Sequence, residues 1–199
     1  MIVVGLTGSI AMGKSATAQM FRDVGIPVFD SDAEVHRLYD RGGEAVGPVA
    51  KRFPQAVHDG IVDRTRLSQS VVNHPAAMAD LEAIVHPLVR KAQAAFLNQN
   101  ASESIVILDI PLLFETGRAS DVDRIVVVSA PADMQRERAL ARPGMTPEKL
   151  AGILARQMPD EEKRARADYV VDSSKGLEHA VQQVREIVAE LKRQDKARP

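Results

Sequence analysis

The sequence predicts an α/β fold: a three-layer α/β/α sandwich around a five-stranded parallel sheet. Short β-branched apolar runs alternate with segments of helical periodicity along most of the chain, which is typical of parallel sheets covered by helices. The first run leads directly into a glycine-rich stretch and a helix. The long segment 33–104 is helical in pattern, so we also expect a helical lobe inserted between the second and third strands.

The first strand is expected at Ile2–Leu6, and the stretch Gly8–Ser15 (GSIAMGKS) follows it. This stretch matches G-x-x-x-x-G-K-[ST] at every fixed position. Glycines let backbone N–H groups approach phosphate oxygens, and the helix expected at Ala16–Arg22 directs its positive end at them. Lys14 is then expected to bridge the β- and γ-phosphates, and Ser15 to hold Mg²⁺. The motif predicts a nucleoside triphosphate site, and its context disfavours an accidental glycine turn.

Composition limits the class of protein. With 199 residues and 45% hydrophobic content, the chain is expected to form a single domain. It has no cysteine, which excludes disulfides and thiolate metal sites. A net charge of −1 gives no electrostatic case for nucleic acid, and no run is apolar enough to span a membrane. We expect a cytoplasmic protein with no nucleic-acid, membrane or obligate protein partner.

The second strand, Ile26–Phe29, ends at Asp30 and Asp32. Acidic residues at the carboxyl end of a parallel strand lie where such sheets carry functional groups, so one carboxylate is a candidate for the nucleotide cleft. The alternative is that Asp30 or Asp32 simply caps the next helix.

Segment 33–104 contains no convincing strand, and we expect its helices at Ala33–Tyr39, Glu44–Arg52, Arg64–Val72 and from Pro75 toward Leu97. Pro87 is expected to kink or break the last of these. A substrate lobe is the natural interpretation of this segment, and a purely structural insertion is the alternative.

The third strand, Ile105–Asp109, ends in a carboxylate that resembles the second acidic element of P-loop enzymes, which supports Mg²⁺. The apolar residues at 110–115 form either a substrate wall or core. After a fourth strand at Arg124–Ser129, a helix runs from Pro131 to Ala141, and another starts at Pro147 and runs to Met158. The arginines of this helix–loop–helix segment suggest a closing lid over about 138–160 that brings cations to the transferred phosphoryl group. Arg142, at the entrance to the loop, is the favoured residue for this role.

Gln135 and Arg138 of the helix from Pro131, and Arg142 directly after it, are spaced i, i+3 and i+7 and fall on one face. Arg136, Arg164 and Arg166 are expected in solvent. The fifth strand is Tyr169–Asp172, and an amphipathic helix, Gly176–Lys192, closes the fold. The nucleotide-binding core is therefore expected at 1–32 and 105–199. No N-K-x-D element of guanine-specific switches is present, and the chain is short for a motor. A P-loop NTPase fold of the nucleotide-kinase type, acting on a small metabolite, is favoured.

The motifs together resemble the dephospho-coenzyme A kinase family along nearly the whole chain. The resemblance rests on the P-loop, the D-x-D element at 30–32, Asp63-Arg64 with His86-Pro87, the run DIPLLFE at 109–115, and the lid with the last strand. It implies transfer of the ATP γ-phosphoryl group to the ribose 3′-hydroxyl of dephospho-coenzyme A, with Mg²⁺. The alternatives are a P-loop kinase for another acceptor, such as a nucleoside or nucleotide, and an ATP-binding regulator without an acceptor.

The resemblance also implies residue roles. Asp32, Lys14 and Arg142 would be catalytic, and Ser15 and Asp109 would serve the metal. ATP would be bound by Gly8, Ala11, Met12, Gly13, Lys14, Ser15, Ala16, Arg138 and Arg142. The acceptor would be bound by Asp32, Arg64, His86, Leu112 and Glu115. Ser9, Ala11 and Met12 replace smaller loop residues of the family, and Ser173 replaces its usual asparagine.

Overall fold

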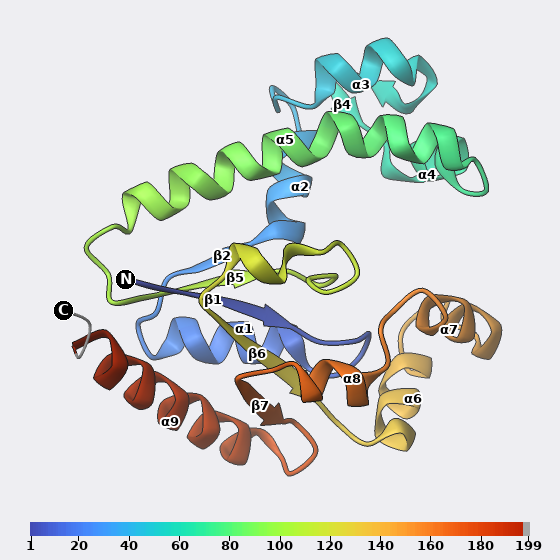
Figure 1. The fold of residues 1–199 in the computed structure, drawn as a ribbon. Helices are drawn as coiled ribbons and strands as arrows, with labels where there is room; N and C mark the ends of the chain where they lie inside the picture. The colour runs from blue at the N-terminus through green and yellow to red at the C-terminus, as the bar shows by residue number, and fades with distance from the viewer. Residues whose placement is uncertain (197–199) are drawn as a thin grey trace. The chain divides into compact units, whose positions relative to one another are not determined.

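The computed structural model describes residues 1–196 and divides them into two compact units. The first unit holds Met1–Phe29 and the described chain from Asn100 onward, and the second holds Asp30–Gln99. Figure 1 labels most of the helices and strands of both units.

The main sheet confirms the predicted five parallel strands and has the order β2-β5-β1-β6-β7. Its strands are β1 (Ile2–Thr7), β2 (Val28–Asp30), β5 (Ile105–Asp109), β6 (Arg124–Ser129) and β7 (Tyr169–Asp172). The bounds of the last three strands are the predicted ones. Because β1 is central and parallel to both neighbours, the loop that follows it leaves the sheet beside the carboxyl ends of β5 and β6.

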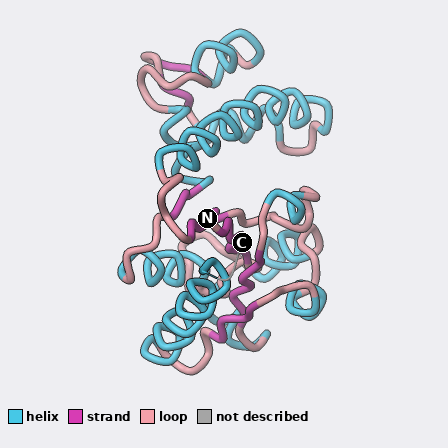
Figure 2. Tube along the Cα trace, turned by 60° about the vertical axis from the view of Figure 1, so that its left-hand side comes forward, coloured by secondary structure: helices cyan, strands magenta, loops and turns pink. Residues whose placement is uncertain are grey.

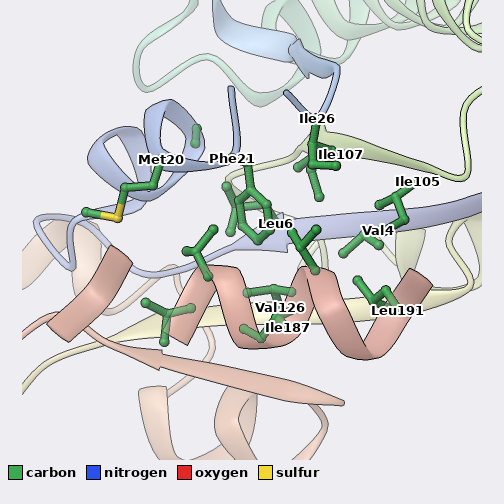
Figure 3. Packing of buried hydrophobic residues seen from close by; sticks show 14 of the residues in the cluster. Val4, Leu6, Met20, Phe21, Ile26, Ile105, Ile107, Val126, Ile187 and Leu191 are labelled. Carbon is green, nitrogen blue, oxygen red and sulfur yellow. The ribbon is translucent and has the colours of Figure 1, made fainter. Parts of the chain in front are cut away.

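The core of the first unit is aliphatic, as expected from a chain without tryptophan. Helices α1 (Lys14–Asp23) and α9 (Leu177–Lys196) pack against the sheet face that carries every second residue of β1. Figure 3 shows Phe21 of α1 and Leu191 of α9 meeting Leu6 and Val4 there. On the other face, a Cβ on Gly5 would lie 3.0 Å from Leu113, and α8 (Asp160–Ala165) contacts β6. Packing on both faces of the sheet fixes the carboxyl ends of β1 and β5, from which the loops of the candidate site begin.

The second unit is mainly helical, as predicted (Figure 2). Its helices are α2 (Ser31–Tyr39), α3 (Val46–Arg52), α4 (Arg64–Val71) and α5 (Pro75–Gln99). The expectation that Pro87 could break α5 is wrong, because the helix continues through it. Proline lacks the N–H that would bond to the carbonyl four residues earlier, so the continuity of α5 comes from its packing against α2, α3 and α4.

A small antiparallel hairpin corrects the prediction that this segment contains no strand. It consists of β3 (Val57–His58) and β4 (Ile61–Val62), joined by Asp59 and Gly60. Both turn residues have positive φ, 50° and 76°, as a type I′ turn requires. The Asp59-Gly60 pair is a sequence signal for a hairpin turn. The hairpin was not predicted because two-residue strands are too short to show alternating apolar and polar residues.

The helices of the segment predicted to be a lid also differ from their predicted bounds. Helix α6 spans Ala132–Leu140, and α7 spans Pro147–Leu154 rather than reaching Met158. The short helix α8 was not predicted, because its charged sequence reads as a solvated turn.

Candidate functional site

The Gly8–Ser15 loop connects β1 to α1 and depends on its two glycines. A Cβ on Gly8 would lie 2.7 Å from the carbonyl oxygen of Val128, which leaves no room for a side chain. Gly13 caps α1 with φ 96°, in the left-handed region. The first N–H groups of α1 are therefore presented at the end of the loop, which is the arrangement that binds phosphates.

Lys14 and Asp109 form a direct ion pair. The Lys14 Nζ lies 2.5 Å from Asp109 Oδ1, and their side chains are only 15% and 4% exposed. The sequence assigned these residues to phosphate and to metal separately and did not predict the pair. Since an ammonium has three N–H donors, Lys14 can keep this contact and still donate to a phosphate oxygen.

A second set of contacts joins the loop to the end of β7. Ser173 Oγ donates to the Met12 carbonyl at 2.7 Å, and the Arg138 guanidinium donates to both Oγ and the carbonyl of Ser173, at 2.9 and 2.8 Å. The side chain of Met12 is buried and accepts from the Ala130 N–H at 3.1 Å. Ser173, which replaces an asparagine of the family, therefore braces the loop and orients Arg138.

These residues border a cleft of about 340 Å³ beside the loop. Its lining includes Gly13, Ala16, Arg138, Arg142 and Ser173, with Leu177 of α9. Arg142 is exposed and follows α6, so its guanidinium is solvent-accessible at this cleft. Apolar walls with cations at one end suit a nucleotide, whose base is apolar on its faces and whose phosphates are anionic.

The DIPLLFE run leads away from β5 and carries two predicted acceptor residues. Thr7 Oγ1 donates to the Pro111 carbonyl at 3.1 Å, which ties this run to the end of β1. Leu112 is 41% exposed and available to a ligand, whereas Leu113 is buried.

Glu115, by contrast, is engaged inside the protein. Its Oε1 lies 2.8 Å from Lys163 Nζ and accepts from the Met158 N–H at 2.8 Å. Burial alone would raise the pKa of Glu115, but the hydrogen bonds from Lys163 and the backbone outweigh it and lower that pKa. Lys163 is fully buried on α8, and the sequence analysis missed it, because it sits in a run of charged residues.

This buried pair predicts a large stability change for Lys163→Met. Removing the Lys163 ammonium leaves the mostly buried Glu115 carboxylate with the Met158 N–H but without a counter-charge, and the loss of one partner of such a pair costs about 3–5 kcal/mol. We expect that loss in urea unfolding at pH 7, with the exposed neighbour Arg164→Met as control. A loss no larger than that of the control would contradict the account.

The same pair gives a pH dependence. Because the folded pKa of Glu115 lies below its ordinary 4.5, its contribution to stability is full above that value and is lost as the pH falls through the folded pKa. The stability difference between the parent chain and Glu115→Gln should therefore shrink below about pH 4.5.

In the second unit, Asp30 is the residue that caps α2, since its Oδ1 accepts from the Ala33 N–H at 2.9 Å. Asp32 lies in the first turn of α2 and is exposed. The structure therefore separates the roles of the two carboxylates, and Asp32 is not needed as the cap.

Arg64, the first residue of α4, donates to Nε2 of His36 on α2, which places the ring proton of a neutral His36 on Nδ1. The buried Tyr39 lies near the same arginine: burial raises the pKa of Tyr39, and the Arg64 charge opposes this. His86 is an exposed residue of α5. The sequence analysis had not assigned His36 a role.

The two residues suggested as metal ligands both offer oxygen atoms, the ligand type that Mg²⁺ prefers. Ser15 offers an exposed hydroxyl next to Lys14, and Asp109 offers a carboxylate. Over residues 1–196, no group of three His, Cys, Asp or Glu side chains could hold an ion alone. Mg²⁺ in nucleotide enzymes is usually held by one or two protein oxygens together with phosphate oxygens and water. No helix in the described part of the chain is long and apolar enough to cross a membrane.

Comparisons with known proteins show the family of the chain. The family model for dephospho-CoA kinase matches residues 2–179. A dephospho-CoA kinase from Mesorhizobium japonicum is 57% identical over 196 residues, covering 98% of both chains. A crystal structure from Thermus thermophilus matches with a TM-score of 0.84 and 36% identity, covering 96% of this chain and 97% of that one. A shikimate kinase from Bacteroides thetaiotaomicron matches in fold alone, with a TM-score of 0.51, 16% identity, and 96% and 98% covered.

Proposed function

The chain belongs to the dephospho-CoA kinase family, and we propose which of its residues bind ATP, bind the acceptor and assist phosphoryl transfer. The chain is an ATP-dependent dephospho-CoA kinase and phosphorylates the ribose 3′-hydroxyl of dephospho-CoA, giving CoA and ADP. The Gly8–Ser15 loop carries the proposal, because it combines glycine positions that leave backbone N–H groups accessible with the Lys14 ammonium at the start of α1.

The donor half of the site is proposed as follows. ATP phosphates lie along the loop, with contacts from Gly8, Ala11, Met12, Gly13 and Ala16, and the base and ribose occupy the neighbouring cleft. Lys14 and Arg142 neutralise the charge that develops on the γ-phosphoryl group, which is the main task of a protein in a loose phosphoryl-transfer transition state. Arg138 borders the cleft from its contact with Ser173.

Ser15 and Asp109 would hold Mg²⁺. An ion held there would supply positive charge that offsets the repulsion between the phosphates and an incoming oxygen nucleophile. Asp109 also orients the Lys14 ammonium through the 2.5 Å contact, so it contributes to the donor site in two ways.

On the acceptor side, Asp32 accepts the proton of the 3′-hydroxyl, because an alcohol is a poor nucleophile until it begins to lose that proton. The lobe 33–104 contributes Arg64 and His86, whose cationic and imidazole groups suit the phosphates of the acceptor. Leu112 offers an apolar surface. Glu115 acts by fixing the loop that carries Leu112, since its Oε1 is held by Lys163 and Met158. Residues 138–160 form the lid. The cytoplasmic location stays a prediction.

An acceptor panel tests this proposal. ADP release with ATP and Mg²⁺ should depend on dephospho-CoA and should be near background with adenosine, other nucleosides or shikimate. Removal of Mg²⁺ with EDTA should abolish turnover, and added Mg²⁺ should restore it. Equal turnover with a nucleoside would point to a different acceptor.

A further inference from the structure

The backbone N–H and carbonyl of Ile10 are both held by side chains from distant parts of the chain. Gln135 Nε2, on α6, donates to the Ile10 carbonyl at 2.9 Å. Gln157 Oε1, just after α7, accepts from the Ile10 N–H at 3.1 Å. The Ile10 N–H is therefore engaged inside the protein and serves to shape the loop.

The next residue, Ala11, is one of three non-glycine residues in the described chain with positive φ, 62°. An L-residue with a Cβ is strained in this left-handed conformation, whereas glycine is not. The contacts around Ala11 must therefore offset the strain of its positive φ, which a glycine at this position would not have. Its methyl packs with Ala139 and Leu150, which belong to α6 and α7.

Both glutamines are themselves fixed. Gln135 is only 7% exposed on α6. Gln157 directly precedes Met158, whose N–H donates to Glu115, and the buried Lys163 holds that carboxylate. Segment 157–163 therefore connects the loop after β1 with the loop after β5.

We propose that Gln135 and Gln157 are positioning residues for phosphoryl transfer: they clamp the Ile10 peptide and so keep the strained Ala11 turn in the conformation that receives the ATP phosphates. The contacts from α6 and from the residue after α7 then shape the phosphate site together with Gly8 and Gly13. This inference rests on the proposed role of Gly8–Ser15 as the phosphate site.

A matched pair of isosteric substitutions tests it. In Gln157→Glu, a carboxylate oxygen still accepts from the Ile10 N–H. In Gln135→Glu, the donor is lost, and a carboxylate faces the Ile10 carbonyl. Each variant adds one negative charge beside the backbone of Ile10, so the long-range electrostatic cost to ATP binding is similar, whereas burying the charge costs more at Gln135.

We expect Gln135→Glu to bind ATP about tenfold more weakly than Gln157→Glu, the size of one lost backbone hydrogen bond and an unpaired carbonyl. The readouts are the ATP Kd by calorimetry and the KM for ATP, with KM for dephospho-CoA similar in both variants. Thermal unfolding checks that both variants are folded. Equal ATP affinity in the two folded variants would overturn the proposal.

A rescue variant separates positioning from a purely structural role. Adding Ala11→Gly to Gln135→Glu removes the strain, so ATP affinity should recover by at least about threefold. If the glutamines only support the fold of the lid, glycine at 11 will not restore affinity, and the inference fails. An inactive parent chain would instead contradict the proposed function, so the two failures are distinguishable.

Discussion

Replacing Asp32 with asparagine is expected to lower kcat by about 10²–10⁴-fold, the usual contribution of a positioned general base. An amide keeps the size of the carboxylate but cannot accept the proton of the 3′-hydroxyl. ATP affinity should change by less than about twofold, because Asp32 is assigned to the acceptor and not to the phosphates. Steady-state kinetics with dephospho-CoA and calorimetry with ATP measure the two quantities.

Asp30→Asn is the matched control, since it makes the same chemical change two residues away. Asp30 caps α2 through the Ala33 N–H, and asparagine caps a helix about as well as aspartate. We therefore expect a far smaller loss from Asp30→Asn. Comparable losses in kcat from both substitutions, or an unchanged kcat in Asp32→Asn, would remove Asp32 from its proposed role.

Replacing Lys14 with alanine is expected to weaken ATP binding and also to lower kcat by about 10²–10³-fold, because the lost ammonium stabilises charge that develops in the transition state. Kinetics at saturating ATP separate the two effects. Retained ATP affinity with normal kcat would contradict the proposed phosphate site.

Lys14→Ala also leaves the Asp109 carboxylate, 4% exposed, without its ammonium partner, so a loss of stability is expected as well. The double variant Lys14→Ala with Asp109→Asn removes that buried charge and should recover part of the melting temperature. Activity should not recover, because the ammonium is still missing. This pattern distinguishes loss of chemistry from loss of fold.

Much of the fold follows from local pattern. The strands β5, β6 and β7 and the loop Gly8–Ser15 lie where their sequences predict, because apolar runs and glycine spacing are local signals. The hairpin at Val57–Val62 was missed because two-residue strands give no alternation.

Long-range pairs could not be predicted in the same way. The two glutamines that hold Ile10 are separated from it by 125 and 147 residues, and Lys14 is 95 residues from Asp109. Lys163 reads as a solvated charge, and only the packing of α8 buries it beside Glu115. Local motifs thus predict the candidate phosphate and metal residues, whereas the distant side chains that contact and orient these residues become visible only in the folded structure.

The most direct test uses ATP that carries ¹⁸O in its γ-phosphoryl group. The enzyme is incubated with this ATP and dephospho-CoA, and the mass of the product is measured. The account predicts CoA that contains the labelled phosphoryl group, with fragment masses that locate it on the ribose 3′-oxygen, and one ADP for each CoA. Labelled inorganic phosphate without CoA, or label on another position of the acceptor, would contradict it.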